Sequence, residues 1–133
     1  AEAVRYEKLV ADLGYADLQI LGVGRNGHIG FNEPADTLFV DTHVTALKPS
    51  TIKDNSRFFA SEKEVPKRAM TMGIGTIMKA KKIVLMASGS NKKEALTALY
   101  SGVADSMIPV TFLQMHPDVT VVFDEAAAPE RKN

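Results

Sequence analysis

A histidine, a carboxylate and two amides lie close together in one glycine-rich segment of the sequence. The four side chains fall within eight residues of one another: Asn26, His28, Asn32 and Glu33. An imidazole exchanges protons near neutral pH, and a neighbouring carboxylate or amide can fix its tautomer and tune its pKa. The spacing predicts an acid/base site carried by His28 and oriented by Glu33 or Asn26. A solvated loop whose histidine only satisfies backbone groups is the alternative.

A second group of residues is suited to binding an anion. In the segment 88–93, an expected strand runs into glycine and serine and then into a helix that begins with lysines. Free N–H groups at a helix start attract a phosphate, and the helix dipole disfavours a lysine there unless an anion offsets it. Arg57, which precedes two phenylalanines, could also clamp a phosphate or lie along the surface. An ordinary N-capped surface helix at 92–100 is the alternative interpretation.

The glycine pattern that precedes His28 can also be interpreted as a cofactor motif. Residues 22–27, GVGRNG, match the dinucleotide fingerprint G-x-G-x-x-G after an expected strand. That fingerprint needs a helix to open within it, because the helix N-terminus holds the pyrophosphate. Gly30 and Pro34 oppose a helix in this segment. We therefore expect no nicotinamide or flavin cofactor.

The hydrophobic pattern predicts strands that alternate with helices. We expect helices at residues 2–13, from 50 or 51 to 59, in a short stretch ending at 80, and at 92–100. We expect strands at 18–21, 42–47, 70–72, 83–87 and 119–123, with a further short element in 109–115, an irregular segment at 24–40 and a frayed end at 124–133. This alternation is typical of α/β proteins. It predicts a three-layer, Rossmann-like open sheet, mostly parallel, with helices on both faces.

Composition narrows the class of protein further. The 133 residues include 16 basic and 16 acidic side chains and no cysteine. Zero net charge gives no reason to expect nucleic acid or an anionic membrane as a partner, and without cysteine there is no disulfide or thiolate chemistry. Apolar runs are too short to cross a bilayer, and the first residues lack a signal-peptide pattern. We expect one α/β domain at 1–133, or half of one, in a cytoplasmic protein without a metal site.

The run LGVGRNGHIGFNEP at residues 21–34, with further matches along nearly the whole sequence, resembles the glucosamine-6-phosphate deaminase family. This run is the most specific match, and the related 6-phosphogluconolactonases lack the FNEP continuation. Further matches lie at 49–51, 55–59, 65–67, 71–76, 89–92, 113–117 and 124–125. The resemblance implies conversion of glucosamine 6-phosphate and water to fructose 6-phosphate and ammonia, with no cofactor. It also implies that His28 opens the sugar ring with support from Glu33 and Asn26, and that Arg57 and Lys92 hold the phosphate.

The same resemblance sets expectations about the rest of the protein. The chain looks like the C-terminal part of a family member, because the family's second phosphate loop and the aspartate that moves the C2 proton belong to an N-terminal half. Such a part alone is expected to be inactive. Asn26 stands where many members have aspartate, which predicts a less basic His28. Residues 33–65 are expected to act as a lid. Two alternative functions stay open: a galactosamine-6-phosphate deaminase/isomerase and a non-catalytic sugar-phosphate-binding fragment. The oligomeric state also stays open, with a homo-oligomer as one possibility.

Overall fold

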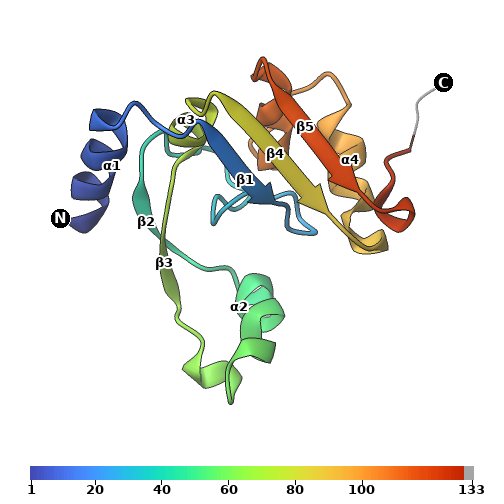
Figure 1. Ribbon diagram of the computed structural model, residues 1–133. Helices are drawn as coiled ribbons and strands as arrows, with labels where there is room; N and C mark the ends of the chain where they lie inside the picture. The colour runs from blue at the N-terminus through green and yellow to red at the C-terminus, as the bar shows by residue number, and fades with distance from the viewer. Residues whose placement is uncertain (131–133) are drawn as a thin grey trace.

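The centre of the molecule is a parallel three-stranded sheet. The computed structural model describes residues 1–130, and its strands β1 (Leu18–Gly22), β4 (Lys82–Ala87) and β5 (Val119–Phe123) are hydrogen-bonded in the order β1–β4–β5 (Figure 1). Two further strands, β2 (His43–Ala46) and β3 (Arg68–Thr71), pair antiparallel in a small second sheet. The α/β class and the parallel sheet predicted from the sequence are confirmed.

Short helices connect these strands. The described residues form four α-helices: α1 (Glu2–Asp12), α2 (Pro49–Asn55), α3 (Ile74–Met78) and α4 (Lys93–Leu99). Single-turn or longer 3₁₀ segments occupy Ser56–Phe58, Glu62–Glu64, Ser90–Lys92, Pro109–Met115 and Glu125–Ala127. Within residues 1–130, no helix is long and apolar enough to cross a membrane.

One face of the three-stranded sheet carries the hydrophobic core. Alternate residues of β4 point to this face, so that Ile83 and Leu85 are completely buried. They belong to one cluster with Ile77 of α3, Leu96 of α4 and Val110 of the 109–115 segment. Burial of such side chains is the main favourable contribution to folding, at roughly 25 cal/mol per Å² of apolar surface. The core therefore fixes the position of the carboxyl ends of the strands, where the candidate site begins.

The opposite face of the sheet is apolar and open to solvent in the described chain. The strand register places Ile20 of β1 level with Val84, and Gly22 level with Met86 and Val122. Ile20 is 62% exposed, Met86 53% and Val122 50%. Apolar side chains exposed on one face of a sheet are the kind that a further layer or a partner buries. A helical layer over this second face stays a prediction.

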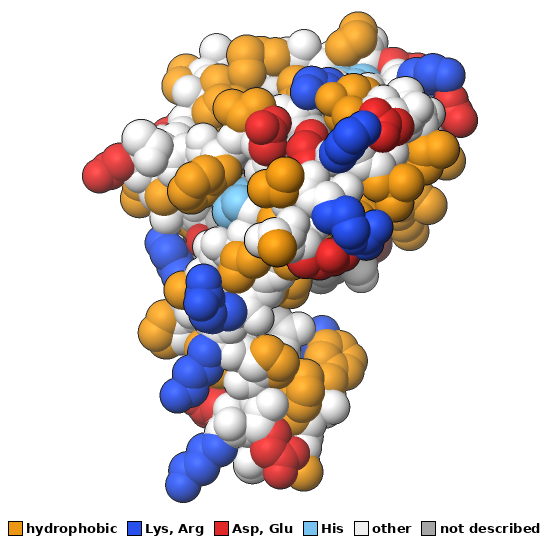
Figure 2. All heavy atoms as spheres, turned by 90° about the vertical axis from the view of Figure 1, so that its left-hand side faces the viewer, with side chains coloured by type: hydrophobic (Ala, Val, Ile, Leu, Met, Phe, Trp, Pro, Cys, Tyr) orange, Lys and Arg blue, Asp and Glu red, His pale blue; other side chains and the backbone are white. Residues whose placement is uncertain are grey.

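The segment from β2 to β3, residues 43–71, forms an arm that projects from the body of the molecule (Figure 1). In the space-filling view it is a narrower lobe below the body (Figure 2). Helix α2 begins at Pro49, ahead of the start expected at residue 50 or 51, because proline's fixed φ and missing N–H suit the first helical position. The predicted lid range overlaps this arm, and its motion stays a prediction.

The start of β3 and the segment after β5 also differ from the sequence prediction, for identifiable reasons. Strand β3 begins two residues earlier than expected, at Arg68, because that residue pairs with Ala46 of β2. The expected fraying after residue 123 is wrong for 124–127, because the Asp124 carboxylate accepts a 2.9 Å hydrogen bond from the Ala127 N–H and closes a turn in which Ala127 is fully buried. Residues 131–133, also expected to fray, lie outside the described residues.

Candidate active site

The loop after β1 folds back so that the His28 ring lies over Gly24. The Gly24 N–H donates to the His28 carbonyl at 2.8 Å, and the Gly27 N–H donates to the Gly24 carbonyl at 2.9 Å. A side chain at position 24 would place its Cβ 2.1 Å from His28 Cε1, and Gly27 has φ +85°, a conformation that favours glycine. Glycine at position 24 thus leaves room for the His28 ring, and glycine at position 27 allows the turn that leads to it. The predicted absence of a helix in 24–40 is confirmed.

His28, Asn26 and Glu33 form a hydrogen-bonded chain. The Nδ1 of His28 lies 2.7 Å from Oδ1 of Asn26, and Nδ2 of Asn26 donates to Oε2 of Glu33 at 2.9 Å. Asn26 Oδ1 also accepts from the His28 backbone N–H at 3.2 Å. We assign the ring hydrogen to Nδ1 from this network, which leaves Nε2 with a free lone pair. The three residues that the sequence singled out for acid/base chemistry are brought together.

The charge state of His28 follows from its surroundings. Burial lowers the pKa of His28 below its usual 6.5, because the imidazolium loses hydration. The Glu33 carboxylate, 3.5 Å from Nδ1, opposes this shift, while the Lys92 ammonium adds to it and Asp54 opposes it. The imidazole is therefore neutral near pH 7, which is the form that accepts a proton.

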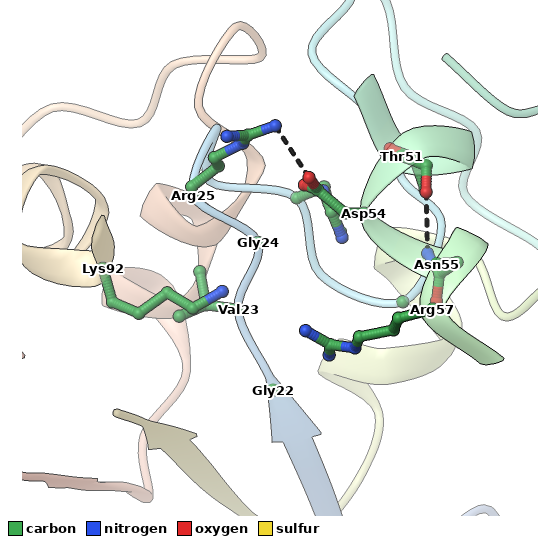
Figure 3. Close-up of a pocket in the computed structure, with 11 residues that line it drawn as sticks. Gly22, Val23, Gly24, Arg25, Thr51, Asp54, Asn55, Arg57 and Lys92 are labelled. Atoms are coloured by element: carbon green, nitrogen blue, oxygen red, sulfur yellow. Dashed lines mark hydrogen bonds and ion pairs between the residues drawn. The ribbon is translucent and has the colours of Figure 1, made fainter. Parts of the chain in front are cut away.

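A cavity of about 330 Å³ opens beside His28 at the carboxyl end of β1. Its walls come from three parts of the chain: the loop at 22–30, the arm at 51–57, and Lys92. Arg57 and Lys92 extend into it from opposite sides (Figure 3). Ligands in open α/β sheets bind at this edge of the sheet. Both cations that the resemblance implied for phosphate binding thus border the same cavity as the histidine.

The cavity has an excess of positive charge. Arg25, Arg57 and Lys92 line it together with a single carboxylate, Asp54, which forms a 2.8 Å ion pair with Arg25 (Figure 3). Burial and the positive charges of Arg25 and Arg57 lower the pKa of Lys92, and Asp54 opposes that shift. Concentrated cations with one internal counter-charge are suited to a dianion, which arginine binds through two parallel hydrogen bonds.

The turn that presents Lys92 differs from the predicted helix start. Lys92 ends a 3₁₀ turn, and α4 begins one residue later without a side-chain cap. Gly89 adopts φ +91°, and the Asp124 carboxylate accepts from the Ser88 hydroxyl at 2.6 Å and from the Gly89 N–H at 3.0 Å. Ser88 is therefore engaged with Asp124 and does not cap the helix. The same bonds, that from Ser88 first, lower the pKa of Asp124.

The sequence analysis missed three side chains at this site. Thr51 was expected only at the start of a helix, but it is buried and its hydroxyl donates to Oε1 of Glu33. Asp54 and Arg25 gave no signal of their own beyond their charge.

The other two histidines have structural contacts, since His43 stacks on Phe39 and His116 contacts the Ala80 carbonyl at 2.6 Å. Residues 1–130 contain no group of three or more potential metal-ligating side chains.

Fold and site together define an α/β protein with a candidate acid/base site at the carboxyl edge of its parallel sheet. The chain belongs to the family described as glucosamine-6-phosphate isomerases/6-phosphogluconolactonase, whose pattern matches residues 1–122. It is 54% identical over 127 residues to a glucosamine-6-phosphate deaminase of Clostridium perfringens, covering 96% of this chain and 52% of that protein. It is 51% identical over 130 residues to one of Staphylococcus epidermidis, covering 98% of this chain and 54% of that protein.

Solved structures show the same fold. A monomeric glucosamine-6-phosphate deaminase, 48% identical in sequence, superposes with a TM-score of 0.91 over 95% of this chain and 52% of its own. A 6-phosphogluconolactonase from Trypanosoma cruzi, 23% identical, gives a TM-score of 0.70 over 94% of this chain and 49% of its own, which is a likeness of fold. The chain spans about half the length of the relatives that it matches.

Proposed function

We propose that this chain supplies the ring-opening and phosphate-binding residues of a glucosamine-6-phosphate deaminase. The overall reaction converts glucosamine 6-phosphate and water to fructose 6-phosphate and ammonia. One observation carries the proposal: a neutral, carboxylate-supported histidine, whose Nδ1 is engaged by Asn26, borders a cavity that also holds Arg57 and Lys92. The names of the relatives at 51–54% identity support it.

His28 is proposed to open the sugar ring. Its Nε2 takes the proton of the C1 hydroxyl and passes it to the ring oxygen as the bond between C1 and that oxygen breaks, leaving an aldehyde at C1. Glu33 lies 3.5 Å from Nδ1 and stabilises the transient imidazolium, while Asn26 holds the ring in place. Arg57 and Lys92 hold the 6-phosphate, which fixes the sugar in the cavity.

The later steps follow from the balance of the reaction. A proton moves from C2 to C1 and a second from the amine nitrogen to the C1 oxygen, which turns the C2 amine into an imine and the C1 aldehyde into an alcohol. Water then adds to C2 and the nitrogen leaves as ammonia, which gives the ketone. The resemblance places the base for the C2 proton in the family's N-terminal half. We therefore assign no residue of this chain to that step.

Ammonia release from glucosamine 6-phosphate by the full-length gene product tests the proposal. Galactosamine 6-phosphate and 6-phosphogluconolactone are assayed in parallel, with His28→Gln and Lys92→Met as variants. We expect ammonia from the gluco sugar, a loss of roughly 100-fold or more in kcat for His28→Gln, and mainly a raised KM for Lys92→Met. Faster turnover of the galacto sugar would change the substrate and keep the mechanism. Binding of the sugar phosphates without ammonia would favour a non-catalytic sensor.

A further inference from the structure

The carboxylate of Glu33 is held from two directions. Its Oε2 accepts from Asn26 in its own loop, and its Oε1 accepts from the hydroxyl of Thr51 in helix α2 of the arm. Glu33 is 8% exposed and Thr51 is 2% exposed. A buried carboxylate that loses one of its donors is destabilised as an anion or rotates toward another partner. The arm therefore takes part in placing the carboxylate beside the histidine.

Helix α2 also continues directly into the segment that carries Arg57, one of the cations of the cavity wall. Arg57 lies in the 3₁₀ turn that continues α2, and the Asn55 amide donates to the Thr51 carbonyl at 2.8 Å (Figure 3). The Arg57 guanidinium lies 4.7 Å from the centre of the Phe58 ring. Thr51 and Arg57 are thus parts of one short, internally bonded segment. An anion that fixes Arg57 also fixes the hydroxyl that holds Glu33.

We propose that Thr51 is a positioning residue that couples the phosphate-binding segment of the arm to the Glu33–Asn26–His28 chain. The proposal rests on the function proposed above. The Thr51 hydroxyl acts through Glu33 and does not touch the reacting atoms. Its role is to keep Oε2 near the imidazole, so that the positive charge acquired by His28 during ring opening is met by a fixed negative charge.

The consequence of removing this hydroxyl has a defined sign. The charged groups acting on His28 are Glu33 from its own loop, Lys92 from the turn before α4, and Asp54 from α2. Glu33 opposes the burial that lowers the pKa of His28. A displaced Glu33 carboxylate gives less opposition, so the pKa of His28 falls further. The acid limb of the pH–rate profile then moves to lower pH, while kcat falls because the imidazolium is less stabilised.

Three variants of Thr51 separate the hydroxyl from the packing. Thr51→Val keeps the branched shape and removes the hydroxyl, Thr51→Ser keeps the hydroxyl, and Thr51→Ala replaces the valine variant if that one does not fold. Ser50→Ala is the matched control, because Ser50 is exposed in the same helix and donates no side-chain hydrogen bond within residues 1–130. Two quantities are measured on the full-length protein: kcat and KM against pH, and the pKa of His28 by NMR titration of its ring without substrate.

We expect Thr51→Val to lower kcat roughly tenfold, as is typical for partners that orient a reactive group, with a lowered His28 pKa and a smaller change in KM. Thr51→Ser and Ser50→Ala should resemble the wild type in both measurements. An unchanged His28 pKa and kcat in Thr51→Val would overturn the proposal, and so would an equal fall in kcat for Thr51→Ser without a pKa change. If the wild type releases no ammonia but the His28 pKa still falls only in variants without the hydroxyl, the positioning role holds and the proposed reaction fails.

Discussion

A single methyl group added at Gly24 should displace the His28 ring and so disrupt the candidate site. In Gly24→Ala the new Cβ would lie 2.1 Å from Cε1 and 2.2 Å from Nδ1 of His28. Ordinary contact begins near 3.4 Å, so the imidazole must retreat by more than about 1 Å. The backbone gives little relief, since the Gly24 N–H is hydrogen-bonded to the His28 carbonyl at 2.8 Å.

That displacement breaks the bond which sets the tautomer of His28. The contact between Nδ1 and Asn26 Oδ1 is 2.7 Å long, and a retreat of the ring stretches it beyond hydrogen-bonding distance. A misplacement of about 1 Å costs on the order of 100-fold in rate, which corresponds to about 2.7 kcal/mol in the barrier. We expect kcat for ammonia release to fall by that order, with little change in the binding of the sugar phosphate through Arg57 and Lys92.

The assay compares Gly24→Ala with Gly22→Ala, where an added Cβ meets no atom within 4 Å. Steady-state kinetics give kcat and KM, and NMR titration gives the pKa and tautomer of His28. The control should keep the histidine spectrum of the wild type. A Gly24→Ala protein with wild-type kcat and an unchanged His28 tautomer would refute the reasoning, because the ring would then have had room that the structure does not give it.

Three further perturbations have defined outcomes. Asn26→Asp places a carboxylate beside the ring, so the His28 pKa should rise and the acid limb of the kcat/KM profile should move to higher pH; NMR and kinetics must agree on the direction. Ile20→Lys puts a charge in the open apolar face of the sheet, so the 133-residue chain alone should self-associate less than the wild type in sedimentation velocity, and equal association would show that this face is not involved. For Glu7, burial raises the pKa of the carboxyl, but hydrogen bonds from Thr42 and Thr76 outweigh burial and the net shift is downward. The stabilisation is thus present above the ordinary value of 4.5 and is lost as the pH falls through the lowered one, so the stability difference between wild type and Glu7→Gln should shrink below pH 4.5 in urea titrations.

Local patterns in the sequence predicted what local physics determines. The strand predicted at 83–87 agrees with the observed one to within one residue. In an α/β protein, a short continuous apolar run bounded by lysines and glycine indicates a buried strand. The cluster of Asn26, His28 and Glu33 was visible because three functional side chains within eight residues of a glycine-rich loop cannot lie far apart. The absence of a helix after the glycine pattern followed from Gly30 and Pro34.

Contacts between segments far apart in the sequence could not be predicted from local patterns. Arg57 and Lys92 were ordinary cations until the resemblance assigned them, because their meeting depends on how the arm sits against the body. The bond from Thr51 to Glu33 spans 18 positions, and a threonine near a helix start is most simply explained as a cap. The Asp124 turn was missed for the same reason, since Ser88 and Gly89, 36 and 35 positions away, complete it.

The orientation of the Asn26 amide connects the charge of Glu33 to the chemistry available at His28. If the amide were reversed, its oxygen would face the Glu33 carboxylate at 2.9 Å and its NH₂ would face the backbone N–H of His28 at 3.2 Å. Both contacts would be repulsive, so both select the same orientation. In that orientation only an oxygen faces Nδ1, which must then carry the ring hydrogen, and Nε2 is left as the acceptor. In addition to its 3.5 Å contact with Nδ1, the Glu33 carboxylate thus determines the tautomer of His28 through a neutral side chain. An aspartate at position 26 would add negative charge beside the ring, whereas the asparagine transmits the orientation alone and leaves His28 the weaker base.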